Sequence, residues 1–331
     1  MKAIFVTDQE WQYKRVYDQD VKNKLAKLFT FDNTCYNKDM LLKGDFKDVE
    51  CVLGTWGMPV LTEDEIKRVF PKLKYIFYSA GTVKYFAEPY LKLGIRVFSA
   101  WQANAVPVIE YAVSQILLAT KGFFQLSAHA KKNYRDAHEI MNIFPGNYHT
   151  KVGILGYGAI AKGVVRELLR HNEDIYVYAP NITHEEAKSL GVHKVDKLEE
   201  IFDKCTVISN HIANLPSTLG MINKDLINRL KDNQTFINTG RGQQVDEKAL
   251  LDKCKNNPKI CAVLDVTYPE PPEQDSLYFK LPNVTVTPHI AGSSGNEVVR
   301  MSNYMYEEAQ RVLHNEKPKY EIDLELFKIL A

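Results

Sequence analysis

The fold is decided by one stretch of the sequence, VGILGYGAIAKGVV at residues 152–165. Its first residues are apolar or glycine, as in a buried strand, and the amphipathic residues after them predict a helix through Arg170. Between strand and helix, Gly156, Gly158 and Ala161 match the G-x-G-x-x-[GA] turn, which places a dinucleotide pyrophosphate at a helix N-terminus. The stretch therefore predicts a dinucleotide-binding strand–turn–helix unit.

Short apolar runs alternate with amphipathic stretches on both sides of this turn. Such alternation predicts parallel sheets with helices on both faces. The expected strands are Ala3–Val6, Val49–Leu53, Tyr75–Tyr78, Ile95–Phe98, Val152–Leu155, Ile175–Tyr178, Thr206–Ser209, Thr235–Asn238, Ile260–Asp265 and Val284–Thr287, and the expected helices include Thr62–Phe70, Asn104–Leu126, Asp246–Lys255 and Asn296–His314. We expect Pro107 in the first turn of its helix, where a missing N–H is harmless.

The length of 331 residues suggests about two domains. A new strand–helix series begins at Val152, and the last long helix follows the last expected strand. The expected fold is α/β, with a Rossmann-type dinucleotide-binding domain inserted after a smaller flavodoxin-like α/β substrate domain. We expect the substrate domain at residues 1–101 plus 292–331 and the NAD(P)-binding domain at 102–291.

The charges nearly balance, with 42 Lys and Arg against 41 Asp and Glu. This balance gives no electrostatic reason to expect nucleic acid or an anionic membrane as partner. The apolar runs are shorter than a membrane span, and the N-terminus lacks the features of a signal peptide. Five scattered cysteines indicate reduced thiols in a cytoplasmic protein, with Cys261 as a core residue. No residue cluster at ligand spacing points to a metal.

Three charged residues stand in loops just after expected strands. Arg241 lies in INTGRG, Glu270 in DVTYPEP and His289 in TPHIAG. Open α/β sheets bind ligands beyond the carboxyl ends of their strands, so these residues are candidates for chemistry. Each one alone is equally compatible with an ordinary surface role.

These motifs, the glycine turn and Ser209-Asn210-His211 together resemble the D-isomer-specific 2-hydroxyacid dehydrogenase family. The resemblance is weak up to about Lys72 and strong from about Lys74 to Gly292. It implies hydride transfer between NAD or NADP and a small anionic 2-hydroxy or 2-keto acid. In the implied roles, Arg241 binds and polarises the substrate, His289 is the general acid/base, and Glu270 assists it. The chemistry is suitable, because histidine titrates near neutrality and a guanidinium fork matches a carboxylate.

The resemblance also implies binding residues and a partner. The implied cofactor-binding residues are Gly156, Tyr157, Gly158, Ala159, Ile160, Ala179, His211, Thr239, Gly240 and Asp265, and the implied substrate-binding residues are Trp56, Ala80, Gly81, Thr82 and Arg241. The segment Lys131–Thr150, which carries Tyr134, His138, Phe144 and Tyr148, implies a homodimer. The alternative is that this segment is an exposed surface segment of a monomer.

Departures from the family pattern leave cofactor and substrate open. The strand Ile175–Tyr178 ends at Ala179, where an Asp or Glu would bind the adenosine ribose. Removing that carboxylate removes the repulsion of a 2′-phosphate, and Asn181, Thr183 and His184 can donate hydrogen bonds, so NAD and NADP are equally expected. Glyoxylate, hydroxypyruvate, a phosphorylated hydroxy acid and a branched 2-keto acid all remain candidate substrates.

Two other kinds of function are compatible with this fold. One is an NAD-sensing, corepressor-like binding protein, although the balanced charge weighs against it. The other is a relative with different chemistry, such as one that oxidises another small anion or hydrolyses an adenosylated thioether. Formate enzymes of the family typically replace the glutamate that is present as Glu270. A short-chain dehydrogenase is excluded, because the chain has no Tyr-x-x-x-Lys pair.

Overall fold

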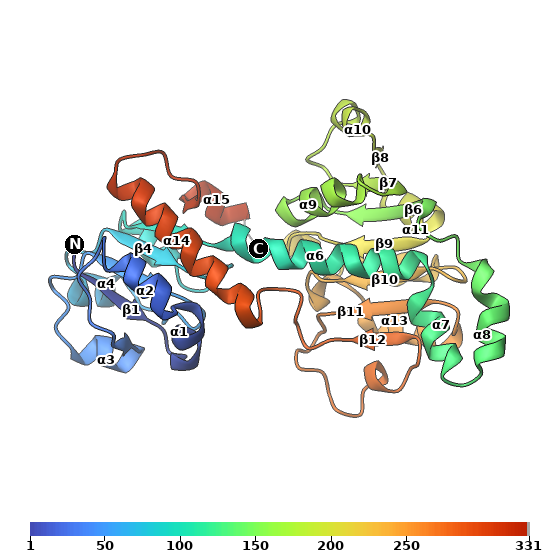
Figure 1. Cartoon of the computed structure of the whole chain (residues 1–331), viewed down its shortest axis with the longest axis horizontal. Helices are drawn as coiled ribbons and strands as arrows, with labels where there is room; N and C mark the ends of the chain where they lie inside the picture. Colours follow the sequence, from blue (N-terminus) through green and yellow to red (C-terminus); the bar gives the residue numbers. More distant parts are fainter. Residues whose placement is uncertain (330–331) are drawn as a thin grey trace. The chain divides into compact units, whose positions relative to one another are not determined.

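The computed structural model describes residues 1–329 and divides the chain into two compact units. Unit 1 comprises Met1–Ala105 and Ser293–Ala331, and unit 2 comprises Val106–Gly292. The first dividing point differs from the expected boundary at 101/102 because Ala103, near the start of a long helix, is buried in a core of unit 1. Each unit has its own sheet (Figure 1) and its own hydrophobic cores.

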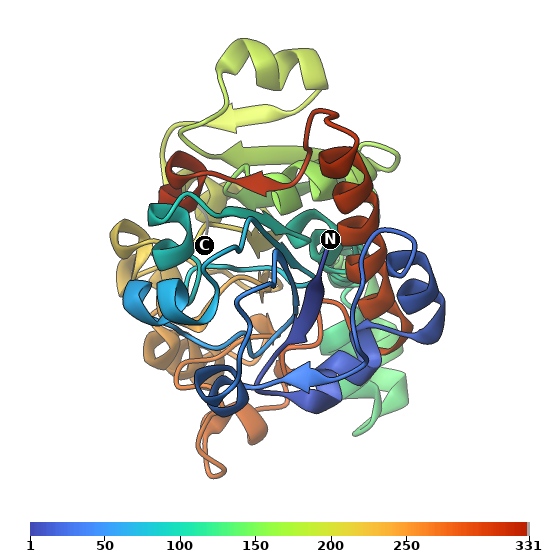
Figure 2. The same ribbon diagram turned by 90° about the vertical axis from the view of Figure 1, so that its left-hand side faces the viewer.

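Unit 1 contains a six-stranded sheet in the order β13-β5-β4-β3-β1-β2. Strands β1 to β5 are parallel, whereas β13 pairs antiparallel with β5 and lies at one edge of the sheet (Figure 2). The order 2-1-3-4-5 of the parallel strands is flavodoxin-like, which confirms the expected fold class of this unit. The strands are β1 Ala3–Val6, β2 Cys35–Tyr36, β3 Cys51–Gly54, β4 Tyr75–Tyr78, β5 Arg96–Ser99 and β13 Glu321–Ile322.

Helices cover both faces of the unit 1 sheet, because each face carries buried apolar side chains. One core lies among α3, α4 and α5, and the other among α1, α2 and α14. The helices are α1 Glu10–Val16, α2 Gln19–Leu25, α3 Lys38–Lys43, α4 Glu63–Val69, α5 Glu88–Lys92, α14 Val298–Leu313 and α15 Leu324–Ile329.

Unit 2 contains a seven-stranded, wholly parallel sheet in the order β12-β11-β10-β9-β6-β7-β8. From β8 to β11 the strands follow the Rossmann order 3-2-1-4-5-6, and β12 is added at the edge beyond β11. This order confirms the expected dinucleotide-binding fold. The strands are β6 Tyr148–Leu155, β7 Asn172–Tyr178, β8 His193–Val195, β9 Val207–Asn210, β10 Thr235–Asn238, β11 Cys261–Leu264 and β12 Val284–Val286.

The two faces of this sheet pack against different helices. Helices α6, α9 and α10 share one core with it, and α11, α12 and α13 share the other; Figure 1 shows α6 running along its face. The helices are α6 Trp101–Thr120, α7 Phe123–Ala130, α8 Tyr134–Ile140, α9 Ala159–Leu168, α10 His184–Leu190, α11 Leu198–Lys204, α12 Lys224–Asn228 and α13 Glu247–Asn256.

The expected helix Asn104–Leu126 was wrong in two respects. The observed helix α6 begins at Trp101, so Pro107 lies inside it rather than in its first turn. The helix loses one backbone hydrogen bond at Pro107. It also ends at Thr120, because Gly122 takes a left-handed conformation (φ 67°) and starts the separate helix α7.

The five cysteines are free thiols, and all except Cys35 are buried. Cys261 is in β11 with no exposed surface, as predicted. Among the described residues, no helix is long and apolar enough to cross a membrane.

Candidate active site

The glycine turn lies at the switch point of the unit 2 sheet, between β6 and β9. Gly156 has a φ of 91°, and a Cβ there would lie 2.7 Å from the carbonyl oxygen of His211. His211 in turn donates its backbone N–H to Leu155 across the two strands at 2.8 Å. Only glycine meets both demands, so the turn stays close to the segment after β9. Burial lowers the pKa of His211 to about 4, which keeps this imidazole neutral.

Two features of this turn, and one of the segment after β10, fit a dinucleotide. Helix α9 begins with Gly158 as its N-cap, and no side chain caps its free N–H groups. Among the described residues, a Cβ at Gly158 would meet nothing within 4 Å, so space is open at the start of the helix. Nearby in the motif after β10, the Thr239 hydroxyl is buried without a hydrogen-bond partner in residues 1–329. A pyrophosphate is stabilised by such N–H groups and by the helix dipole.

A buried network of amide side chains shapes the segments after β9 and β10. Asn210 donates to Asn238 at 3.0 Å and to Gln244 at 2.9 Å. The Gln244 oxygen also accepts from the backbone of Arg241, and Asn238 accepts from the backbone of Gly240. The network thereby fixes the turn that carries Arg241. Asn210 and Asn238 lie within the sequence motifs, but the motifs predicted no role for either side chain. Their position at the ends of two neighbouring expected strands was the feature of the sequence that could have indicated the contact.

Arg241, Glu270 and His289 follow β10, β11 and β12, which are neighbours in the sheet. His289 Nδ1 lies 2.7 Å from Glu270 Oε1, and both side chains remain partly exposed. The Arg241 Nη1 atom donates to the carbonyl of Gly240 at 2.7 Å, which leaves other N–H groups of the guanidinium for a ligand. The structure therefore brings the histidine and the glutamate into contact and positions the arginine on the adjoining strand end.

Asp265 holds the loop that carries His289. Its carboxylate accepts from the backbone N–H groups of Ile290 (2.8 Å) and Ala291 (2.9 Å) and from the Thr287 hydroxyl (2.6 Å). His289 itself has a φ of 54°, a conformation that non-glycine residues adopt rarely and at a free-energy cost. The bonds to Asp265 offset that cost. Most of the carboxylate's acceptor positions are therefore used within the protein, although the resemblance implies that it binds cofactor.

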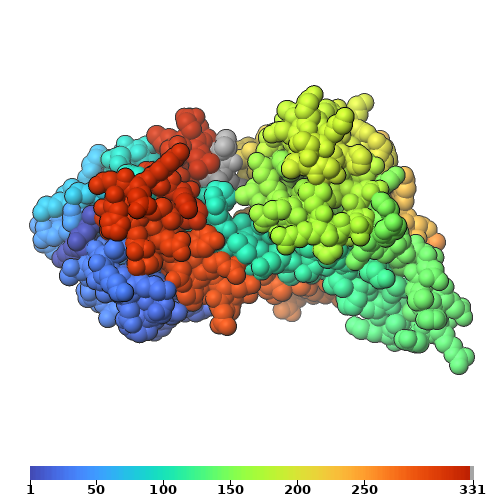
Figure 3. Space-filling model, turned by 45° about the horizontal axis from the view of Figure 1, so that its top comes forward, coloured from blue at the N-terminus to red at the C-terminus, as the bar shows by residue number. Residues whose placement is uncertain are grey.

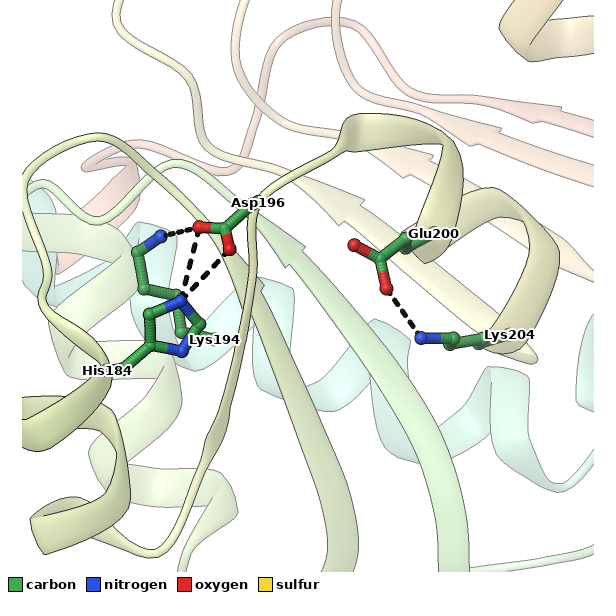
Figure 4. Close-up of polar contacts among 5 residues, drawn as sticks. All are labelled: His184, Lys194, Asp196, Glu200 and Lys204. Atoms are coloured by element: carbon green, nitrogen blue, oxygen red, sulfur yellow. Dashed lines mark hydrogen bonds and ion pairs between the residues drawn. The ribbon is translucent and has the colours of Figure 1, made fainter.

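The segment after β7, where the ribose-binding carboxylate is missing, contacts a charged cluster (Figure 4). Asp196 follows β8, whose last residue pairs with Tyr178, so Asp196 lies one strand over from Ala179 at the same sheet edge. Lys194 and His184 both contact the Asp196 carboxylate, His184 at 3.0 Å, and their hydrogen bonds lower its pKa. A pocket of about 600 Å³ lies beside it, lined by residues that include Tyr178, Lys197, Met221 and Arg229.

The other polar residues after β7 already have partners in the chain. Asn181 donates its amide to the carbonyl of Tyr157 at 3.0 Å, and Thr183 caps α10 by accepting from Glu186. His184 is also exposed, with 60% of its side chain accessible, and it contacts Asp196. All three donors considered above are thus already engaged within the chain, His184 with Asp196.

The expected substrate loop belongs to unit 1 and follows β4. The Ser99 hydroxyl donates to the carbonyls of Ala80 (3.0 Å) and Gly81 (2.5 Å). In a trans peptide the N–H points opposite to the carbonyl, so the N–H groups of Gly81 and Thr82 point away from Ser99. Two adjacent N–H groups with this common direction can bind an anion. Trp56 is half-buried, and its carbonyl accepts from Thr7 at 2.5 Å.

The combination of the parallel sheet, the glycine turn and the residues at its strand ends defines unit 2 as a Rossmann-type nucleotide-binding domain. Residues 113–291 match the family model "D-isomer specific 2-hydroxyacid dehydrogenase, NAD binding domain". The chain therefore belongs to the D-isomer specific 2-hydroxyacid dehydrogenase family, as its motifs predicted. Among residues 1–329, no group of three His, Cys, Asp or Glu side chains could bind a metal ion.

The curated relatives of the chain include two D-3-phosphoglycerate dehydrogenases. The chain is 30% identical over 284 residues to D-3-phosphoglycerate dehydrogenase of Methanocaldococcus jannaschii, covering 86% of this chain and 53% of that protein. It is 31% identical over 281 residues to D-3-phosphoglycerate dehydrogenase of Haemophilus influenzae, covering 80% of this chain and 65% of the relative. The chain thus spans about half to two thirds of the length of these relatives.

Solved structures share the fold across nearly the whole chain. The apo D-mandelate dehydrogenase of Rhodotorula graminis superposes with a TM-score of 0.78 and 18% identity, covering 97% of each chain. At this identity the likeness concerns the architecture of the chain, and the chemistry is argued from its own residues.

Proposed function

We propose that the chain transfers a hydride between NAD or NADP and a small 2-hydroxy or 2-keto acid. The observation that carries this proposal is the Glu270–His289 contact of 2.7 Å, next to the strand end that bears Arg241 on a nucleotide-binding sheet. Membership of the family supports the same reaction class. The nicotinamide cofactor, when bound, supplies or accepts the hydride.

His289 is the proposed general acid/base. Glu270 occupies its Nδ1 atom, which leaves Nε2 as the nitrogen that can exchange a proton with the substrate oxygen. In reduction, His289 donates a proton to the oxygen of the 2-keto group, and in oxidation it removes the proton from the hydroxyl. The carboxylate of Glu270 orients the ring.

Arg241 is the proposed substrate-binding residue. Its guanidinium carries five N–H donors in a fixed plane, of which one contacts Gly240. The remaining donors suit a carboxylate and an adjacent keto oxygen, where they stabilise the negative charge that develops as hydride arrives. In unit 1, we propose that the N–H groups of Gly81 and Thr82 also bind an anionic group of the substrate. The relatives named for D-3-phosphoglycerate make a phosphorylated hydroxy acid the first candidate.

For the cofactor, we propose that the chain uses both NAD and NADP. The end of β7 lacks a carboxylate at Ala179, which removes the usual barrier to a 2′-phosphate. The nearby cluster contains one carboxylate, Asp196, and two groups able to bind phosphate, Lys194 and His184. These opposing charges favour neither cofactor strongly.

An initial-rate screen tests the proposal. Phosphorylated and unphosphorylated 2-keto acids are offered with NADH and with NADPH to the wild-type chain and to His289→Ala. We expect turnover of at least one acid that is lost in the variant, and rates with the two cofactors that differ by less than about a thousandfold, or about 4 kcal/mol. Cofactor binding without turnover of any acid would favour the corepressor-like alternative. A larger difference between cofactors would refute dual use.

A homodimer is the proposed assembly. The segment that includes α7 and α8 exposes large apolar side chains, among them Phe123, Tyr134, Ile143 and Tyr148. Figure 3 shows this segment, in green, at one end of unit 2. Exposed apolar clusters of this kind are typical of interfaces between subunits.

A further inference from the structure

Glu247 is a buried carboxylate that contacts the loop carrying Glu270. It is the first residue of α13 and is only 8% exposed. Its Oε2 atom accepts from the backbone N–H of Tyr268 at 2.7 Å and from the hydroxyl of Tyr278. Tyr268 is two residues before Glu270, so this one carboxylate joins the start of α13 to the loop that carries Glu270.

A close backbone contact joins the same loop to the turn that carries Arg241. A Cβ on Gly242 would lie 2.2 Å from the carbonyl carbon of Thr267 and 2.6 Å from the nitrogen of Tyr268. The loop after β11 therefore packs against the segment after β10 at two successive residues, Thr267 and Tyr268. Glu270 projects from the end of this attached stretch toward His289.

Few charged groups surround Glu247. The titratable groups that face it are Tyr278, from the 3-10 turn Leu277–Phe279, and Glu270, from the loop. On its own helix, Asp246 caps the N-terminus, and Lys248 pairs with Asp252 instead of Glu247. No lysine, arginine or histidine of residues 1–329 forms an ion pair with Glu247, and its Oε1 atom is buried without a hydrogen-bond partner. Burial, with a smaller contribution from the charge of Glu270, raises the pKa of Glu247 to about 7.

We propose that Glu247 is a positioning residue for the Glu270–His289 pair: it fixes the loop that carries Glu270, and it adds a second negative charge near the pair. This inference rests on the proposed function. The carboxylate acts through Glu270 and touches neither substrate nor cofactor in the proposed mechanism.

The expected effect on catalysis follows from the sign of the charge. An ionised Glu247 repels the negative charge of Glu270, and it therefore stabilises the proton that the Glu270–His289 pair retains. Reduction of a keto acid needs that proton, so the charge extends activity toward alkaline pH. Removing the charge moves the alkaline limb of the rate profile to lower pH, by about half a pH unit for a partly screened pair.

A first experiment uses the protein without cofactor or substrate. Carbon-13 NMR of glutamate-labelled protein follows the Glu247 carboxyl, whose resonance is assigned by its loss in Glu247→Gln. We expect a titration midpoint near neutrality in the wild type and a lower midpoint in Glu270→Gln, because the charge of Glu270 raises the pKa of Glu247. An unchanged midpoint in Glu270→Gln overturns the coupling, whatever reaction the protein catalyses.

A second experiment measures kcat and KM against pH for variants that separate hydrogen bonding from charge. Glu247→Gln keeps an acceptor oxygen but loses the charge, whereas Tyr278→Phe keeps the charge and loses one donor. Glu200→Gln is the control, since Glu200 lies on α11 and forms an ion pair with Lys204 at 2.6 Å (Figure 4).

We expect Glu247→Gln to move the alkaline limb to lower pH and to lower kcat about threefold, with KM for the keto acid unchanged. Tyr278→Phe should move the limb less than Glu247→Gln, because it keeps the carboxylate and only raises its pKa through the lost hydrogen bond. A limb that moves equally in Glu200→Gln, or not at all in Glu247→Gln, overturns the proposal. Absence of turnover in the wild type would refute the proposed function. The carboxyl titration would then still show whether Glu247 and Glu270 interact.

Discussion

Glu270 Oε1 lies 2.7 Å from His289 Nδ1, although the two residues come from different loops 19 positions apart. The contact forms because these loops follow β11 and β12, which are neighbouring parallel strands whose carboxyl ends share one edge of the sheet. Parallel neighbours bring residues that are distant in sequence to the same place. The proposed acid/base function depends on this contact.

Replacing His289 tests the proton-transfer role. We expect His289→Asn to lower kcat by about 100-fold to 10,000-fold, the usual loss when an acid/base group is removed. Cofactor affinity, measured by fluorescence titration of NADH, should change little, because the glycine turn and α9 are untouched. A variant with near-normal kcat would reject the role.

Asp265 should matter through the loop that it supports. Asp265→Asn replaces one acceptor oxygen by an amide and leaves a backbone or hydroxyl donor of the loop unpaired. We expect the free energy of unfolding to fall by about 1–3 kcal/mol, with a loss of kcat as the histidine leaves its left-handed conformation. Urea unfolding and steady-state rates measure both. Asp232→Asn is the control, since Asp232 is an exposed partner of Lys259, and an equal effect in both variants would contradict the argument.

Cofactor choice should respond to a carboxylate at the end of β7. Ala179→Asp places an acceptor for the ribose hydroxyls and repels a 2′-phosphate. We expect the ratio of kcat/KM for NADH over NADPH to rise by about 10-fold to 100-fold, or about 1.4–2.7 kcal/mol. An unchanged ratio would mean that the adenosine ribose binds elsewhere.

The raised pKa of Glu247, about 7 against an ordinary value of 4.5, makes stability depend on pH. The folded protein binds this proton more tightly than the unfolded chain, so ionisation of Glu247 lowers the free energy of unfolding as pH rises from 4.5 to about 7. The upper limit of this loss is about 3 kcal/mol. Glu247→Gln should therefore be more stable than the wild type at pH 8 but not at pH 4.5, as measured by urea unfolding. Equal differences at both pH values would exclude the titration.

The proposed dimer predicts a specific sensitivity to charge on the α7–α8 segment. Light scattering should give a mass of twice 37.9 kDa for the wild type and a single 37.9 kDa for Ile143→Asp, which places a charge among exposed apolar side chains. Val60→Asp is the control, because Val60 is similarly exposed but lies in unit 1. A wild-type mass of 37.9 kDa would exclude the dimer.

The sequence predicted those elements whose pattern is local. Buried strands such as β4 and β10 are short apolar runs, and both were expected at their observed bounds. Strands β2, β8 and β13 were not expected, because two or three residues cannot display an alternating pattern and form only against a neighbouring strand. A single glycine at 122 ended α6 within an otherwise continuous helical pattern.

In the site, too, local motifs were predictable and tertiary contacts were not. Motifs indicated the candidates His289, Glu270 and Arg241, because these residues stand in loops after strands, within recognisable motifs. The amides of Asn210 and Gln244 and the carboxylate of Glu247 remained without a role, since their partners are set by strand order and helix packing. Burial and hydrogen bonding across the sheet are tertiary properties, and no local pattern encodes them.

The free cysteines make the chain its own reporter of unfolding. Burial raises the pKa of Cys35 to about 11 and that of Cys205 and Cys254 to about 12, so folded thiols are scarcely ionised at neutral pH. Alkylating reagents attack the thiolate, and their reaction with the four buried thiols must therefore wait for these thiols to become exposed. Mass spectrometry of the alkylated peptides would then time the opening of unit 1 through Cys51 and of unit 2 through Cys261, without any added label.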